Sequence, residues 1–354
     1  MNNAYRYFVF YILIFMQSSC SNPHPLLNYK TIILTGHTMG TVWRVNVVDI
    51  EAKRKQTLYT SIQKILDYDD IQISTWKSNS VLSRFNQYQG YKSQPVSSEI
   101  ADIITQALRI GNQMNGAMDV TIGSLVNLWG FGPRGSSKCT PTQLQIDCAR
   151  ALHGLSYLTV INSSTQSYLR KDIPGIYIDL SSVGEGYAVD HLVNLMKKEG
   201  IDNYLVSVGG AIVTCGHNAQ GKPWKIAIQK PIDQENAVQE IVELKGCAIS
   251  TSGTYRNYYE LNGKPISHLI NPFTGEPVHN ELVSATVIAP TALEADCWDS
   301  GLMILGLRKA QELAVKHKKA VYLIYKKNNQ LISWISPKFF PFIESPSLNN
   351  TQAK

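Results

Sequence analysis

The sequence has few charged side chains and no long hydrophobic run after residue 16. Only 17% of its 354 residues are charged, and 33 Lys and Arg against 27 Asp and Glu leave a formal net charge of +6. This charge is too dilute to indicate a nucleic-acid partner, and no basic run or RNA-binding motif accompanies it. No later segment approaches the ~20 apolar residues of a membrane span, which excludes a multi-pass transporter. A hydrophobic fraction of 44% excludes a disordered or fibrous chain.

Cysteine is also scarce, and its spacing excludes two kinds of chemistry. The six cysteines form no C-x-x-C pair, so neither a zinc centre nor thioredoxin-like chemistry is indicated. With Cys20 set aside, five remain, of which Cys139 and Cys148 could form a bridge in an oxidising periplasm. The odd number favours free, buried thiols instead.

The first 19 residues have the pattern of a signal peptide. Arg6 precedes the uncharged apolar run 7–16, which is too short for a span, and small residues lead to Cys20. A Cys in this place resembles a bacterial lipobox, although Gln17 replaces the usual aliphatic residue, and an ordinary cleaved signal is the alternative. We expect a signal peptide at 1–19 and a lipidated Cys20 with a tether at 20–30. The anchor would hold the protein on the periplasmic side of the inner membrane, with the outer membrane as the alternative.

The rest of the chain has both helical and strand periodicity, which predicts an α+β fold. We expect a single compact unit of mixed sheets and helices over residues 31–340, either as one body or in two lobes, and a tail at 341–354. Helices are predicted from Ser98 to Asn115, after Thr140, at 185–199 and at 291–306, and strands at 176–180, 204–208, 224–229, 321–325 and 331–335. Neither a Rossmann nor a P-loop motif is present.

The sharpest local pattern is an oxygen-rich face on the helix that follows Thr291. Asp296, Asp299 and Ser300 stand at i, i+3 and i+4, so two carboxylates and a hydroxyl share one side of the helix. Three hard oxygen ligands suit Mg²⁺ or Ca²⁺ better than zinc. The alternative is a solvated acidic first turn, stabilised by the helix dipole.

Four further features are candidates for the functional site, and each also has a purely structural explanation. The turn 184–186 (GEG) opens a helix and either receives a phosphate or packs tightly. Residues 125–132, rich in aromatics and glycine, either line a planar ligand or fill a core, and residues 250–256 form either a hydroxyl-rich ligand loop or a turn. His268, between a strand and a turn, is either a general base or a hydrogen-bonded structural residue.

Taken in series, ten short segments resemble the ApbE family, the FAD:protein FMN transferases. They occur in the family's order across residues 31–337, nearly the whole mature chain. The segments are 39–41 (MGT), 73–76 (ISTW), 116–121 (GAMDVT), 129–132 (WGFG), 178–180 (IDL), 184–190 (GEGYAVD), 207–210 (SVGG), 250–253 (STSG), 268–272 (HLINP) and 294–296 (EAD). The resemblance implies a T-fold-like ApbE architecture.

The resemblance also implies a site, residue by residue. His268 would be the catalytic base. The metal Mg²⁺ would be held beside the FAD pyrophosphate by a backbone oxygen near Ser182 together with Asp296, Asp299 and Ser300. The FAD contacts would be Met39, Trp76, Ala117, Met118, Asp119, Asp179, Glu185 and Ile270. Three residues depart from the family's common pattern: Glu185 stands where many relatives have Lys, Ser300 replaces Thr, and Met118 replaces Phe.

Members of the family transfer FMN from FAD to a Thr hydroxyl of a partner flavoprotein and release AMP. The resemblance thus implies FAD as substrate and acceptors such as subunits of Na⁺-translocating NADH:quinone reductase or Rnf-type complexes. Mg²⁺ would neutralise charge on the phosphoryl oxygens, so no covalent protein nucleophile is needed. Two alternatives stay open: an FAD pyrophosphatase giving FMN and AMP, and an FAD-binding lipoprotein without chemistry.

Overall fold

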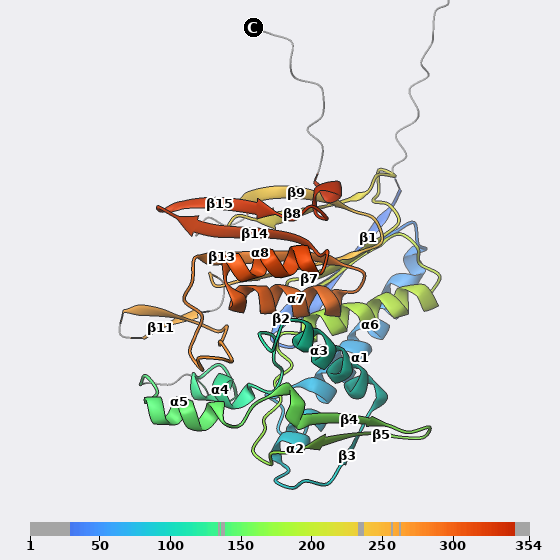
Figure 1. Cartoon of the computed structure of the whole chain (residues 1–354). Helices are drawn as coiled ribbons and strands as arrows, with labels where there is room; N and C mark the ends of the chain where they lie inside the picture. The colour runs from blue at the N-terminus through green and yellow to red at the C-terminus, as the bar shows by residue number, and fades with distance from the viewer. Residues whose placement is uncertain are drawn as a thin grey trace, which may run out of the picture.

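The centre of the molecule is an eight-stranded antiparallel sheet (Figure 1). The structure is a computed structural model, and it describes residues 29–133, 135, 139–232, 237–255, 258–261 and 263–343. In spatial order the strands are β1 (Thr31–Thr38), β2 (Thr41–Val48), β6 (Tyr204–Val208), β7 (Ala211–Cys215), β10 (Ala248–Gly253), β13 (Leu282–Ala289), β14 (Ala320–Lys327) and β15 (Gln330–Ile335).

Different elements cover the two faces of this sheet. The hairpin of β8 (Trp224–Gln229) and β9 (Val238–Leu244) packs on one face, where Ile288 of β13 and Tyr322 of β14 meet Val242. Their sequence neighbours Val287 and Val321 point to the opposite face, as the two-residue period of a strand requires. There the cover is helical: α1 (Lys55–Ile73), α3 (Ser98–Gln113), α6 (Gly184–Lys198), α7 (Ala292–Leu305) and α8 (Leu307–Lys316).

The remaining elements form a second lobe below the helices in Figure 1. It contains α2 (Val81–Gln87), α4 (Gly123–Leu128), α5 (Gln143–Arg150) and a three-stranded sheet of β3 (Gln94–Val96), β5 (Ser167–Lys171) and β4 (Leu158–Asn162). A hairpin of β11 (Tyr258–Leu261) and β12 (Lys264–Ser267) projects beside α4 and α5. One hydrophobic core joins Phe85 and Leu169 of this lobe to Trp298 of α7. The α+β prediction is therefore confirmed, with two lobes on a shared core.

Most predicted elements are confirmed. Ser97 accepts a hydrogen bond from the N–H of Ile100 at the start of α3, and Asn115 and Gly116, both at positive φ, follow its end. The strands at 204–208 and 224–229, the terminal hairpin and helices α6 and α7 lie where the sequence predicts. At α7 only half of the capping box forms: Thr291 caps the N–H of Glu294, whose carboxylate pairs with Lys319 instead.

Three expectations are wrong. Helix α5 begins at Gln143, capped by Thr142, rather than after Thr140, because Thr142 and Gln145 form the reciprocal capping box. Segment 176–180 is not a strand: it forms one isolated bridge, between Tyr177 and Ile122, and the side chain of Asn86 bonds the backbone of Ile178. Cys139 and Cys148 are exposed rather than buried, and Cys148 is a free thiol, so no bridge joins them.

The predicted signal peptide (1–19), Cys20 and most of the tether and tail lie outside the described residues. Among the helices that the structure describes, none has the length and hydrophobicity of a membrane span.

Candidate active site

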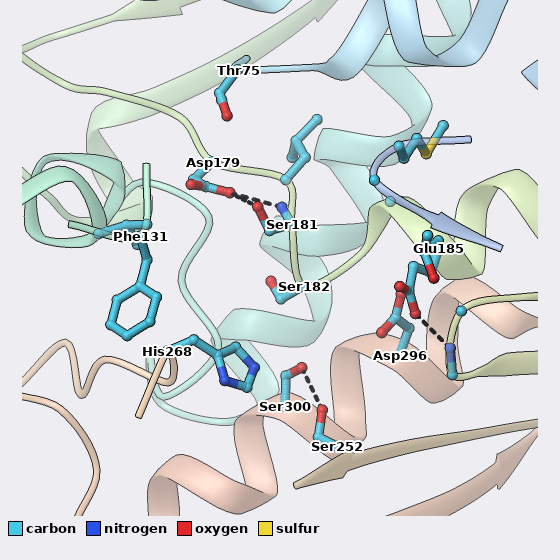
Figure 2. A pocket seen from close by; sticks show the side chains of 18 of the residues that line it. Thr75, Phe131, Asp179, Ser181, Ser182, Glu185, Ser252, His268, Asp296 and Ser300 are labelled. Carbon is cyan, nitrogen blue, oxygen red and sulfur yellow. Dashed lines mark hydrogen bonds between the residues drawn. The ribbon is translucent and has the colours of Figure 1, made fainter. Parts of the chain in front are cut away.

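A cavity of about 1130 Å³ lies between the helical side of the large sheet and the second lobe (Figure 2). It collects ten of the twelve predicted FAD and metal residues from distant parts of the chain, together with the predicted base. Those that line it are Met39, Trp76, Met118, Asp119, Asp179, Ser182, Glu185, His268, Ile270, Asp296 and Ser300. Ala117 does not line the cavity, because its small side chain is packed in the core. Asp299 lies directly beneath the cavity wall on α7.

The oxygen-rich face of helix α7 points to the interior of the protein and not to water. Asp296, Asp299 and Ser300 are all buried, so the solvated-turn alternative is wrong. Strand β10 supplies the partners: the hydroxyl of Ser252 donates to Oδ1 of Asp299 at 2.9 Å, and Ser250 also hydrogen-bonds this carboxylate. Both serines occupy the helical face of β10, because residues two apart on a strand share a face.

Asp299 keeps one oxygen atom without a partner. Its side chain is fully buried, and among the described residues nothing hydrogen-bonds its Oδ2 atom. Burial raises the pKa of Asp299 to about 7, against the hydrogen bonds from three serines that favour the charged form. A buried carboxylate oxygen without a protein partner is costly, and binding either a proton or a cation would offset that cost.

Asp296 stands one turn earlier on α7 and contacts α6. Its Oδ2 atom accepts a hydrogen bond from the N–H of Gly186 at 2.8 Å. Burial raises the pKa of Asp296 well above its usual range, and the charges of Asp299 and Glu185 raise it further. A cation shared by these carboxylates would remove their mutual repulsion.

Glu185, on the first turn of α6, closes this acidic group. Its Oε2 atom accepts a hydrogen bond from the N–H of Gly210 at 2.7 Å, and its carboxylate lies against Gly209, which leaves no room for a β-carbon there. Gly186 is required for packing, because a β-carbon would lie 2.5 Å from the carbonyl oxygen of Ala292. The tight-packing alternative for the 184–186 turn is therefore supported for Gly186, whose N–H is taken by Asp296.

The donor set around Asp299 fits a hard divalent cation. Two carboxylates and the hydroxyl of Ser300 offer only oxygen, as Mg²⁺ prefers, and among the described residues nothing hydrogen-bonds the Oδ2 atom of Asp299. No preformed group of three or more His, Cys, Asp or Glu ligands occurs in the part of the chain that the structure describes. A cation here would thus complete its shell with serine or backbone oxygen, water and substrate, as Mg²⁺ commonly does.

Asp179 and Asp119 lie on the opposite wall, and each has an internal partner. Asp179 accepts hydrogen bonds from the N–H and hydroxyl of Ser181, two residues on. Asp119 accepts hydrogen bonds from the N–H and hydroxyl of Thr121, and its other oxygen lies 3.1 Å from Nδ1 of His153. Both carboxylates line the cavity while they stabilise the turns that carry them.

His268 projects into the cavity immediately after β12 (Figure 2). Its ring lies 6.3 Å from that of Phe131, edge to face. Phe131 belongs to the aromatic segment 125–132, which both lines the cavity and fills a core. Trp129 is buried and donates its indole N–H to the carbonyl of Gly275, whereas Phe131 lines the cavity.

The rim is formed by two segments near the N-terminus. Met39 sits in the tight turn between β1 and β2 at φ 48°, a left-handed conformation that is uncommon for a side-chain-bearing residue. Trp76, in the α1–α2 loop, is 65% exposed although it lines the cavity. An exposed indole at a cavity mouth is a suitable stacking surface for a planar ring.

The cavity is acidic. Among its described lining residues Lys77 is the one Lys or Arg, and it pairs with Asp70, which also lines the cavity. The remaining lining carboxylates are Asp119, Asp179, Glu185 and Asp296. An anionic ligand such as a pyrophosphate would be repelled by this wall unless a cation accompanied it.

Sequence reasoning missed several lining or supporting residues. Thr75, Lys77 and Ser181 line the cavity, and Ser252 hydrogen-bonds the α7 cluster. Thr75 and Ser252 lie inside the segments ISTW and STSG, which carry the family resemblance, and this position is the sequence signal that could have identified them. His153 has no such signal in the sequence, because only the fold brings its ring next to Asp119.

The ApbE family model matches residues 39–324. The chain belongs to the ApbE family. A Salmonella typhimurium protein named FAD:protein FMN transferase is 56% identical over 313 residues, which are 88% of this chain and 89% of the relative. The solved structure of the flavin transferase ApbE from Vibrio cholerae matches with a TM-score of 0.80 and 37% identity, covering 89% of this chain and 99% of that one. Apo flavinyl transferase ApbE from Pseudomonas stutzeri matches with a TM-score of 0.82 and 33% identity, over 91% and 99%.

The ApbE identification made from the ten short segments is thus confirmed, and so is the prediction of a transferase. The matched residues 39–324 span every segment that lines the cavity, from Met39 to Ile304. The roles of individual residues stay predictions, which the geometry above makes testable.

Proposed function

We propose that this protein transfers FMN from FAD to a threonine hydroxyl of an acceptor protein in an Mg²⁺-dependent reaction that releases AMP. The observation that carries the proposal is the buried oxygen cluster of α7: Asp296 and Ser300 line an acidic cavity, and Asp299 lies beneath them with an Oδ2 atom that no described residue hydrogen-bonds. The names of the relatives, FAD:protein FMN transferase, support the same reaction.

The metal site would consist of Asp296, Asp299, Ser300 and a backbone oxygen near Ser182. When bound, Mg²⁺ would supply charge neutralisation for the pyrophosphate and for the departing AMP. The protein's own part is to hold these oxygens in place: Gly186 orients Asp296, and Ser250 and Ser252 orient Asp299. Because these partners already hydrogen-bond the carboxylates, the site would need little reorganisation when the cation binds.

FAD would lie in the cavity with the residues predicted for it, including Met39, Trp76 and Asp179. In the transfer step the threonine oxygen forms a bond to the FMN phosphorus, and the bond from that phosphorus to the bridging oxygen breaks, so AMP leaves with this oxygen. The hydroxyl proton passes to His268, whose ring projects into the cavity. Such general-base assistance typically contributes 10²–10⁴-fold.

The acceptor is proposed to be a flavoprotein subunit of a Na⁺-translocating NADH:quinone reductase or of an Rnf-type complex. A lipid anchor on Cys20 would hold the enzyme at the periplasmic side of the inner membrane. Both proposals rest on the sequence, because Cys20 lies outside the described residues.

The test uses the chain from residue 21 onward, FAD, Mg²⁺ and an acceptor domain with its target threonine. We expect the acceptor's intact mass to rise by one FMN, with AMP released in equal amount, and neither to occur after chelation of the metal. Replacement of the acceptor threonine by valine is the control. AMP without labelled acceptor would instead indicate FAD hydrolysis, and bound FAD without AMP would indicate a flavin-binding protein.

A further inference from the structure

Helix α2 contributes no residue to the cavity, yet its two ends hydrogen-bond two of the cavity's walls. The helix spans Val81–Gln87, and none of these residues lines the cavity. The first wall is the loop before α2, which carries Thr75, Trp76 and Lys77. The second wall is the segment that carries Asp179, Ser181 and Ser182.

At the start of α2, two serines hold the first wall. The Ser80 hydroxyl donates to the carbonyl of Ser74 at 2.6 Å, and the Ser83 hydroxyl donates to the same carbonyl at 3.1 Å. Ser74 in turn accepts the N–H of Trp76 on its own hydroxyl, at 3.1 Å. The loop that presents Trp76 is therefore tied to the first turn of α2.

At the end of α2, Asn86 holds the second wall. Its buried amide donates to the carbonyl of Ile178 and accepts the N–H of the same residue, both at 2.8 Å. The Lys171 ammonium, also buried, donates to the carbonyls of Phe85, Asn86 and Ile176. Together these two side chains satisfy backbone groups of Ile176 and Ile178, which the neighbouring chain at 120–123 does not bond.

We propose that Asn86 is a positioning residue, which acts through Ile178 to set where Asp179 and Ser182 stand opposite α7. Asp179 directly follows the residue that Asn86 holds, and its N–H donates to the carbonyl of Val120 at 2.8 Å. Without the amide, Ile178 loses both of its bonds to Asn86, and of the bonds described here only those of Lys171 still link this wall to α2. The inference rests on the proposed function, because it assigns this wall to FAD and the metal.

The expected effect of Asn86→Ala is a loss of at least tenfold in FAD affinity and in kcat/KM. The matched control is Asn280→Ala. The Asn280 amide likewise bonds two backbone groups, the N–H of Leu282 at 2.9 Å and the carbonyl of Met303 at 3.1 Å. Asn280 is exposed, and neither of its partners adjoins a predicted FAD or metal residue, whereas Ile178, the partner of Asn86, adjoins Asp179. A general loss of stability would affect both variants, whereas a positioning role affects FAD binding in Asn86→Ala alone.

The experiment measures FAD affinity by flavin fluorescence in the presence of Mg²⁺, and kcat and KM for FMN transfer, in a cycle of Asn86→Ala and Asp179→Ala. If Asn86 acts through the wall, the double variant loses less than the product of the two single losses. Independent, multiplicative losses would overturn the proposal, and so would an Asn86→Ala variant that binds FAD as Asn280→Ala does. If the wild-type protein binds FAD without transferring FMN, the proposed function fails, while the affinity cycle still decides the role of Asn86.

Discussion

Asp296 of α7 accepts a hydrogen bond from the backbone N–H of Gly186 of α6, at 2.8 Å. The two helices can approach this closely because Gly186 has no side chain: a β-carbon there would lie 2.5 Å from the carbonyl oxygen of Ala292. The same contact thus joins helix packing to the orientation of a proposed metal ligand.

Gly186→Ala should therefore damage packing and activity together. The added methyl group meets backbone rather than a flexible side chain, so the helices must separate, at a cost of about 1–3 kcal/mol in the free energy of unfolding. Urea denaturation measures this cost. Gly184→Ala is the control, because its β-carbon would meet only the end of the Ile73 side chain, at 3.2 Å. Equal stability of the two variants would contradict the packing argument.

Mg²⁺ should stabilise the wild-type protein and not Asp299→Asn. The cation binds the folded state through the buried Asp296 and Asp299, so at a concentration 100-fold above its Kd it adds about 2.7 kcal/mol. Thermal denaturation with Mg²⁺ and with EDTA measures the shift. Asp172→Asn changes an exposed carboxylate and should respond as the wild type does. A full Mg²⁺ shift in Asp299→Asn would remove Asp299 from the site.

His268→Ala should keep FAD and lose transfer. Removal of the base from the cavity should lower kcat by about 10²–10⁴-fold, while the contacts that hold the dinucleotide remain. The measurements are acceptor labelling by intact mass and FAD affinity by fluorescence. His279→Ala, an exposed histidine that lies eleven residues on and does not line the cavity, is the control. Normal labelling by His268→Ala would refute its role as the base.

Trp76→Ala should weaken FAD binding, because the exposed indole offers a stacking surface at the cavity mouth. Stacking of a base on an aromatic side chain contributes about 1–3 kcal/mol, so the Kd should rise roughly 5- to 150-fold. Trp76→Phe should retain most of the affinity. Tyr91→Ala, equally exposed but away from the cavity, should have no effect on the titration. An unchanged Kd in Trp76→Ala would place the ring system elsewhere.

Stability should rise with pH above about 8 because of Lys171. Burial lowers the pKa of this ammonium from 10.5 to about 8, so between these values the unfolded chain binds more protons than the folded protein. Folding therefore becomes more favourable as the pH rises through this window, by about 3 kcal/mol in total. Denaturation of wild type and Lys171→Met between pH 7.5 and 9.5 tests this. The same slope in both proteins would mean that Lys171 is not the cause.

Local signals in the sequence were sufficient for most elements and for the α7 cluster. Asp296, Asp299 and Ser300 fall on one helix face by spacing alone, and Thr291 marks where that helix begins. Segment 176–180 shows where such signals fail. Its apolar run is typical of a strand, but whether a strand forms depends on a continuous partner. Here the segment has one isolated bridge to Ile122, and the amide of Asn86, ninety-two residues away, bonds Ile178.

The sequence by itself determined the family, the α+β class and the types of atom available to the site, because these follow from local spacing and from ten ordered segments. Only the tertiary structure decided that the acidic face of α7 is buried, that Gly186 and Ser252 orient its carboxylates, and that Ala117 is core. The physical reason is that burial and hydrogen-bond partners arise from contacts between residues far apart in the chain, such as β10 with α7, which no local pattern contains.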